Sequence, residues 1–221
     1  MPDQSSRQKD DIIRDAIVTE LVMANRILAR EDVIDDFGDI MEFTMDGDLV
    51  GEDHRRPYAE RHIHGAIYRD RPDVNAVTHH HARSVLPFTM ADVSLRPMFH
   101  MASVIGKEIK IWDSQDEFGD TNMLVDSMEM GHSLSRTLGN NRVALLRGHG
   151  CICAAADIRS VIMISIALKD NAALVQETRQ LGEITYLTDG EIDKESRMLL
   201  SEMPLARAWD YWVARAGFHG L

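Results

Sequence analysis

The chain has 221 residues, of which 44% are apolar and 27% charged, a balance that suits a globular domain with a sizeable core. With 36 acidic and 24 basic residues the formal net charge is -12, and such a surface repels nucleic acids and anionic membranes. We therefore expect no nucleic acid and no membrane as a partner. An anionic small-molecule substrate would need local positive charge, from a metal ion or from clustered arginines.

The first helix predicted from the sequence covers residues 9–31, where apolar residues recur at steps of three and four. Next we expect two short strands around the Asp46-Gly47 turn in residues 40–50, a helix at 60–70 and a strand at 74–81. A strand at 108–112 and a helix at 121–138 follow, and then strands at 143–147 and 151–155.

The remaining third of the chain is predicted to be helical. Asp157 caps a long helix to about Leu181, and Thr188 and Glu191 have the spacing of a capping box for another helix. Pro204 opens or kinks the last segment. Because strands and helices interleave without strict regularity, we expect one α/β domain over residues 1–221, with a mixed or antiparallel sheet covered by helices.

The N-terminal residues and the cysteines favour a cytoplasmic location. The stretch MPDQSSRQKDD lacks the apolar core of a signal peptide, and no apolar run approaches the roughly 18 residues of a membrane span. Cys151 and Cys153 would share one face of a strand, a spacing too constrained for an ordinary disulfide. A metal-binding pair and small core residues are the two interpretations, and the second is favoured.

Three consecutive histidines end the strand predicted at 74–81. Because strand side chains alternate between faces, His79 and His81 share one face and His80 points the other way. A His-x-His pair held at a strand end is a ready chelate for zinc, iron, manganese or cobalt. A run of surface histidines would look the same in the sequence, so both interpretations stay open at this point.

His149 and Glu60 are further candidate ligands. His149 lies between two glycines directly after a strand, where glycines leave room around an imidazole, although an ordinary turn histidine would fit as well. Glu60 begins the helix that leads by a short connection into the strand of the histidines, and its alternative role is a solvated first-turn carboxylate. His62 and His64 are also two apart, but on a helix that spacing does not share a face, so we interpret them as packing or pocket residues.

With these motifs in place, the chain from about Ile12 onward resembles the class II aldolase/adducin family. The resemblance rests on ANRILARE, ERHIHGAIYRDRPDVNAVTHHHA, the RGHG turn and the long helix after it. Members of the family hold one divalent metal ion per subunit with an acidic residue and three histidines, which here fall on Glu60, His79, His81 and His149. The family also implies a three-layer α/β/α fold around a mainly antiparallel sheet, and homotetramers or octamers with active sites near subunit boundaries.

Within that family, the resemblance favours decarboxylation. Sugar-phosphate aldolases hold phosphate with a Gly-Asn loop and a Ser-Ser pair, whereas this chain has PYAE at the position of that pair. The segments SVLPF, LRPMFHMAS, EFGDTNMLV and RAWDYW are similar to decarboxylases of hydroxylated aromatic or pyridine dicarboxylates in ring degradation. The alternatives are a metal-dependent aldolase acting on a hydroxy-carbonyl or sugar-derived substrate, and a non-catalytic adducin-like assembly module, against which the complete ligand set argues.

The expected chemistry assigns roles to further residues. Glu60 is the candidate for proton transfer, while the metal ion acts as a Lewis acid on a substrate oxygen. Arg83, Arg96 and His100 would hold a second carboxylate or ring hydroxyls, with surface ion pairs as the alternative for the arginines. Tyr211, in an aromatic cluster near the C-terminus, would close a neighbouring subunit's pocket over an aromatic ring or else pack in the core.

One departure from the family pattern follows VIDDFG. Relatives continue with a histidine, a strand pair and a longer stretch before the segment that resembles DIMEFT, whereas here Gly38 runs directly into Asp39. The stretch is either naturally deleted or missing from the chain, and the match of both flanks favours the second. In relatives it contributes to the substrate pocket.

Overall fold

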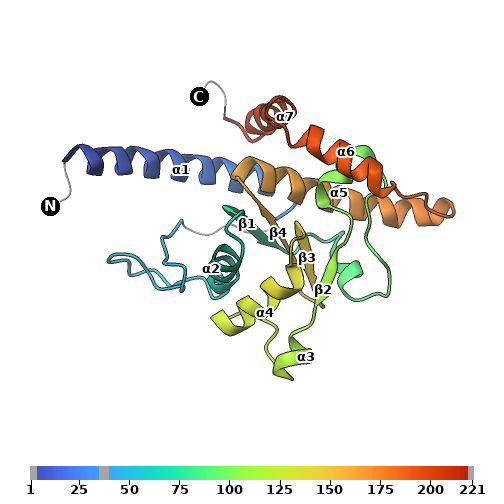
Figure 1. Cartoon of the computed structure of the whole chain (residues 1–221), viewed down its shortest axis with the longest axis horizontal. Coiled ribbons are helices and arrows are strands. Elements are labelled where there is room, and N and C mark those ends of the chain that lie inside the picture. The colour runs from blue at the N-terminus through green and yellow to red at the C-terminus, as the bar shows by residue number, and fades with distance from the viewer. Residues whose placement is uncertain (1–3, 35–39, 219–221) are drawn as a thin grey trace.

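A four-stranded sheet lies between two layers of helices in the computed structural model (Figure 1). The structure describes residues 4–34 and 40–218, with side chains from residue 9 onward. The strand order is β1-β4-β3-β2; β2 pairs parallel with β3, and the other two pairings are antiparallel. This confirms the predicted α/β/α architecture with its mainly antiparallel sheet. The predicted gap between Gly38 and Asp39 lies outside the described residues, and one domain over residues 1–221 stays a prediction.

The strands are short, and their burial follows their place in the sheet. The two central strands are almost wholly buried, because helices cover both faces of the sheet. The strands are β1 (Ala76–His80), β2 (Lys110–Trp112), β3 (Val143–Leu146) and β4 (Gly150–Ala155).

Each layer of helices buries a separate cluster of apolar side chains against the sheet. Along β3, Leu145 belongs to the cluster under α5 and Leu146 to the cluster under α2 and α4, as strand alternation requires. The α5 layer contains α1 (Gln4–Arg30), α5 (Ile158–Leu181), α6 (Asp189–Leu199), α7 (Glu202–Arg215) and the short 3-10 helix η2 (His100–Ile105). The α2 layer contains α2 (Arg61–Asp70), α3 (Ser114–Phe118) and α4 (Met128–Leu138), while the 3-10 helix η1 (Leu86–Thr89) lies near β3.

Helix caps confirm most predicted boundaries in the C-terminal third. The Asp157 side chain accepts a hydrogen bond from the Ser160 backbone N–H at the start of α5. Thr188 and Glu191 cap α6 reciprocally, each side chain accepting from the other's backbone N–H. Pro204 lies in the first turn of α7, where its missing N–H costs no helical hydrogen bond.

Two predicted elements are wrong in part. The helix predicted at 121–138 begins only at Met128, because the Ser127 side chain caps the later start by accepting from the Met130 N–H. The stretch 121–127 is a loop instead. In residues 40–50 a turn at Asp46-Gly47 is present, but the expected strands reduce to a single bridge between Phe43 and Leu49.

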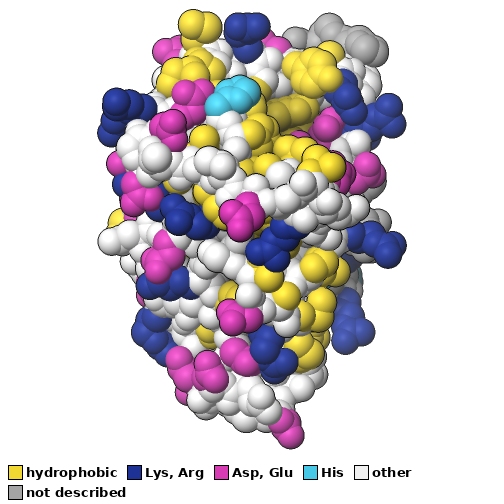
Figure 2. Space-filling view, turned by 90° about the vertical axis from the view of Figure 1, so that its right-hand side faces the viewer, with side chains coloured by type: hydrophobic (Ala, Val, Ile, Leu, Met, Phe, Trp, Pro, Cys, Tyr) yellow, Lys and Arg dark blue, Asp and Glu magenta, His cyan; other side chains and the backbone are white. Residues whose placement is uncertain are grey.

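Among the residues that the structure describes, no helix combines the length and the apolar character needed to cross a bilayer. Figure 2 shows acidic and basic side chains interspersed over one face of the molecule, with apolar side chains exposed at several places between them. The net negative charge is therefore not concentrated on that face.

Candidate metal centre

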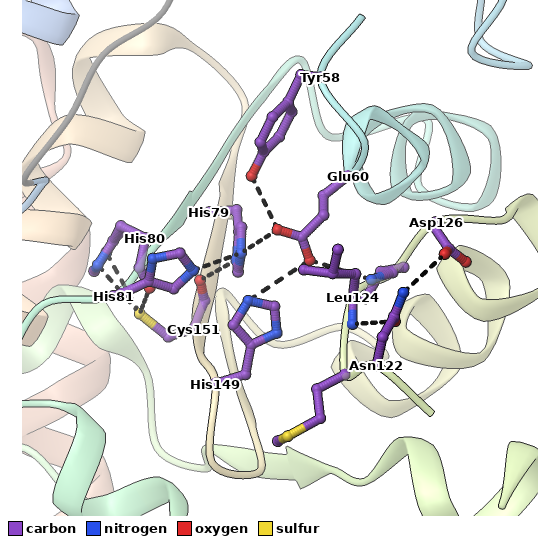
Figure 3. Close-up of polar contacts among 12 residues, drawn as sticks. Tyr58, Glu60, His79, His80, His81, Asn122, Leu124, Asp126, His149 and Cys151 are labelled. Carbon is purple, nitrogen blue, oxygen red and sulfur yellow. Dashed lines mark hydrogen bonds and ion pairs between the residues drawn. The ribbon is translucent and has the colours of Figure 1, made fainter. Parts of the chain in front are cut away.

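Three histidines converge at the end of β1 on the side of the sheet that α2 covers. His79 is in β1 and His81 follows directly after it, and their shared face is the one predicted from strand alternation. His149 comes from the turn between β3 and β4; the pairing of His80 with Cys151 brings this turn beside the end of β1. The three ring centroids lie 4.8, 4.9 and 4.9 Å apart (Figure 3).

A backbone contact orients the His79 ring. Its Nδ1 lies 3.1 Å from the carbonyl oxygen of Cys151, and because a carbonyl only accepts, Nδ1–H is the donor. The Nε2 atom of His79 therefore keeps its lone pair, and it faces Nε2 of His81 at 3.2 Å. A hydrogen bond from one ring nitrogen to the backbone is the usual way in which a metal-binding histidine is held in the correct tautomer.

Glu60 completes the cluster from the start of α2. It occupies the N-cap position, but its side chain makes no capping hydrogen bond and turns into the site instead, only 3% exposed. One carboxylate oxygen, Oε2, lies 3.3 Å from Nε2 of His79, and the other, Oε1, lies 3.6 Å from Nε2 of His149. The solvated first-turn carboxylate considered from the sequence is therefore wrong.

The surroundings keep the Glu60 carboxylate ionised. Burial by itself raises the pKa of Glu60, but the adjacent His79 ring and the backbone N–H of Val125 outweigh it and lower the pKa to about 2. Burial lowers the pKa of His149, which favours the neutral imidazole. A carboxylate grouped with imidazoles is the donor set that divalent metal ions bind.

The four residues fit a divalent metal ion. One ligand atom from each of Glu60, His79, His81 and His149 lies within 4.8 Å of all the others. Metal–nitrogen bonds of about 2.1 Å separate neighbouring ligands by roughly 3 to 3.5 Å. The contacts of 3.2, 3.3 and 3.6 Å in the cluster are close to that spacing. Among the described residues, this is the one group of histidine, cysteine and acidic side chains that meets the geometry.

Glycine is needed on each side of His149 for a different structural reason. Gly148 has a φ of +63°, a backbone conformation that favours glycine in the turn. Gly150 lies so close to β1 that an added Cβ would be 2.6 Å from the carbonyl oxygen of His80 and 2.7 Å from the His81 ring. The first glycine therefore makes the turn, and the second allows the two strands to approach.

The site is closed on one side and open on the other. The side chains of His79 and Glu60 are 1% and 4% exposed, whereas His81 is exposed. Arg83, two residues beyond His81, is also exposed and makes no hydrogen bond or ion pair with the described residues. The open side of the site is therefore the side on which His81 lies.

The other histidines singled out in the sequence do not join the cluster. His80 is buried on the α5 side with its ring against the Cys151 sulfur. Both cysteines are buried there without a disulfide, which confirms them as core residues. His62 and His64, on α2, lie outside the four-residue group. Burial lowers the pKa of His64 to about 4, so this imidazole is neutral.

The remaining residues assigned to substrate binding are not beside the four ligands within one chain. Arg96 lies in the α5 layer, where its guanidinium faces Asp189 and the Tyr186 ring. His100 begins η2, which packs against α5 and α6. Tyr211 is an exposed residue of α7, and its hydroxyl accepts a hydrogen bond from Arg215. Their roles stay predictions.

Two groups at the site were not foreseen from the sequence. The Val125 backbone N–H donates to Glu60 Oε1 at 3.2 Å, and the Tyr58 hydroxyl donates to Oε2 at 3.1 Å. A backbone donor leaves no mark in the residue types, and a tyrosine two residues before a glutamate forms no recognisable motif. Burial and the Glu60 carboxylate raise the pKa of Tyr58.

Proteins similar to this chain include both decarboxylases and aldolases. The decarboxylase tropJ of Talaromyces stipitatus is 26% identical, covering 83% of this chain and 77% of that protein. A 3,4-dihydroxyphthalate decarboxylase of Arthrobacter keyseri is 27% identical over 69% of this chain, and the match spans only 61% of that enzyme. A 5-deoxy-D-ribulose 1-phosphate aldolase of Bacillus thuringiensis is 24% identical, covering 70% and 68%.

The fold and the family agree with these relatives. The structure of an aldolase II superfamily protein from Pseudomonas syringae matches with a TM-score of 0.70 and 19% identity, covering 89% of this chain and 90% of that one. The sequence pattern of the class II aldolase and adducin N-terminal domain family matches residues 19–175, which include all four clustered residues. The chain therefore belongs to the class II aldolase and adducin N-terminal domain family.

Proposed function

We propose that this protein is a metal-dependent lyase, and specifically a decarboxylase of a hydroxylated aromatic or pyridine dicarboxylate of the kind met in ring degradation. The observation that carries the proposal is the convergence of Glu60, His79, His81 and His149 within 4.8 Å. A single divalent ion per subunit, zinc, manganese, iron or cobalt, suits three imidazoles and a carboxylate. When bound, such an ion supplies a Lewis acid for an oxygen that gains negative charge.

The chain's own residues have distinct tasks in this proposal. The open side of the site, next to His81, admits an anionic substrate. The Arg83 guanidinium, two residues further along the chain and exposed, binds a carboxylate of that substrate. Glu60 moves the proton through its carboxylate oxygens, because it is the one acidic group in the cluster. In the reaction, one proton that comes from solvent and passes by way of Glu60 is added to the ring carbon that carries the carboxylate. The carbon–carbon bond then breaks, CO2 leaves, and the electron pair of that bond restores the aromatic ring.

Two observations favour decarboxylation over aldol cleavage. One relative, 27% identical to this chain, is a decarboxylase named for 3,4-dihydroxyphthalate, which is a hydroxylated aromatic dicarboxylate. In addition, Tyr58 and Ala59 stand where sugar-phosphate aldolases of the family have the Ser-Ser pair, and the Tyr58 hydroxyl is already engaged by Glu60. The site next to Glu60 thus lacks that pair of phosphate-binding hydroxyls.

A metal-dependent aldolase is the second candidate. The aldolase relative is 24% identical and the decarboxylases are 26% and 27% identical, a difference too small to separate the two reactions. Both reactions need an oxyanion stabilised next to a carbon that carries negative charge. The same four ligands would serve either one.

We also propose that the chain acts as a homotetramer or octamer in the cytoplasm. Tyr211 is 57% exposed, and Arg96 and His100 lie in the α5 layer, so all three residues would reach substrate only in the site of a neighbouring subunit. An adducin-like assembly module without catalysis is the remaining alternative, and the complete set of ligands argues against it.

The test is a pair of assays on the purified protein loaded with each of the four metals. We expect CO2 release from hydroxylated phthalates or hydroxylated pyridine dicarboxylates, and loss of that activity in Glu60→Gln and after chelation. Glu129→Gln, which alters an exposed glutamate of α4, is the matched control and should keep full activity. Cleavage of sugar phosphates without CO2 release would establish the aldolase instead. Metal binding with neither activity would favour the assembly module.

A further inference from the structure

The Glu60 carboxylate is held at both oxygens by groups that are not metal ligands. Oε1 accepts the backbone N–H of Val125 at 3.2 Å, and Oε2 accepts the hydroxyl of Tyr58 at 3.1 Å. Figure 3 shows the Tyr58 ring on the side of Glu60 away from His149, with its hydroxyl directed at the carboxylate. Each oxygen therefore has one outer donor and one histidine of the cluster nearby.

The segment that carries Tyr58 is itself fixed. Arg61, in the first turn of α2, donates from one guanidinium nitrogen to the carbonyl oxygen of Tyr58 at 2.9 Å. It donates from Nε to the carbonyl oxygen of Gly47 at 2.6 Å, and its guanidinium lies over the Phe43 ring. Arg61 thus ties the turn at residues 44–48 and the Tyr58 backbone to the helix that begins with Glu60.

The two outer donors differ in how easily the chain could replace them. The Val125 N–H belongs to the backbone and is present whatever residue stands there. The Tyr58 hydroxyl depends on the side chain, which is 50% exposed and therefore contributes little to the core. A half-exposed tyrosine with its hydroxyl on a buried carboxylate suggests a role in the site rather than in stability.

We propose that Tyr58 is a positioning residue that fixes the Glu60 carboxylate for metal binding and proton transfer by donating to Oε2. The proposal rests on the metal-dependent function proposed above and extends it to a residue outside the ligand set. A carboxylate free to rotate presents its oxygens to a metal ion in several orientations, whereas two fixed donors select one of them. Groups that hydrogen-bond to metal ligands in this way typically account for 10- to 100-fold in metal affinity or activity.

The test compares Tyr58→Phe, which removes only the hydroxyl, with Tyr186→Phe. Tyr186 is a partly buried tyrosine near α6 whose hydroxyl has no hydrogen bond with the described residues. Metal-free protein is titrated with Zn2+ and with Mn2+ by calorimetry, without any substrate. We expect Tyr58→Phe to bind metal about tenfold more weakly than the unaltered protein. Tyr186→Phe should bind normally, and the thermal stability of both metal-free variants should be unchanged.

A second measurement separates positioning from substrate contact. With saturating metal and the substrate found in the activity screen, Tyr58→Phe should lower kcat about tenfold and leave KM nearly unchanged. A raised KM with normal kcat and normal metal affinity would make Tyr58 a substrate-binding residue and overturn the proposal. Equal metal affinities in the three proteins would overturn it as well. Because metal binding is measured without substrate, a failure to decarboxylate leaves this result intact, whereas an unaltered protein that binds no metal refutes both proposals.

Discussion

Each face of β1 carries a histidine, and the two histidines, His79 and His80, have different surroundings. On the face toward α2, His79 lies with His81 beside a buried carboxylate. On the face toward α5, His80 is 2% exposed and packs against the sulfur of Cys151. On the same face, the Thr78 hydroxyl forms a hydrogen bond with the Ser165 hydroxyl of α5. The comparison teaches that the residue type does not decide which histidine joins the candidate metal centre. The decisive factor is what the neighbouring helix offers to that face.

The largest expected effect on metal affinity comes from substituting the histidine of one face of β1, with the histidine of the other face as the comparison. His79→Ala removes one of the four candidate ligands. It should reduce metal affinity by at least about a hundredfold, which is more than the loss of a group that only hydrogen-bonds to a ligand. His80→Leu keeps the volume in an apolar environment, so it should change the free energy of unfolding by less than about 1.5 kcal/mol and leave metal binding intact. Metal content after dialysis, together with urea unfolding, measures both effects. Full retention of metal by His79→Ala would refute the metal centre.

A smaller effect on metal affinity is expected at Gly150, where an added side chain would press on both the His80 backbone and the His81 ring. In Gly150→Ala the new Cβ would meet the backbone of His80 and the ring of His81, so β4 must shift away from β1. We expect a loss of roughly 1–3 kcal/mol in unfolding free energy, as for an overpacked core site, together with weaker metal binding. Gly190→Ala, at a position with open space around it, is the control. Normal metal affinity in Gly150→Ala would mean that the close strand approach is not needed for the site.

The smallest effect is expected on the α5 side alone. Ser165→Ala removes the partner of the Thr78 hydroxyl, which lies 2.8 Å away, and leaves that hydroxyl without this bond. The free energy of unfolding should fall by about 1 kcal/mol. Metal affinity should remain normal, because the bond lies on the opposite face of β1 from the ligands. Chemical denaturation and the same calorimetric titration check the two parts, and a tenfold loss of metal affinity would show that the two faces are coupled.

Local chemistry explains which parts could be predicted from the sequence. The alternation that separates His80 from its neighbours and the caps at Asp157 and Thr188 depend on residues close in sequence, and all three are confirmed. Assigning Glu60 and His149 to the same site needed the family pattern, because nothing local relates them.

The parts that could not be predicted depend on backbone geometry or on distant contacts. The sequence predicts a helix across residues 121–127, yet in the structure this stretch is a loop that brings the Val125 N–H to Glu60. The Tyr58 hydroxyl reaches the same carboxylate from a segment without regular structure. The assigned roles of Arg83, Arg96, His100 and Tyr211 stay predictions for the same reason.

The bond from His79 to the Cys151 carbonyl joins residues 72 positions apart, and this has a consequence for stability. The four candidate ligands come together only when β1 and β4 have paired, so the unfolded chain has no comparable site. Any metal ion bound at the centre must then stabilise the folded state by mass action, by about 2.7 kcal/mol when free metal exceeds the dissociation constant a hundredfold. The melting temperature of this protein would thus record the supply of its metal, even in a cell that contains no substrate.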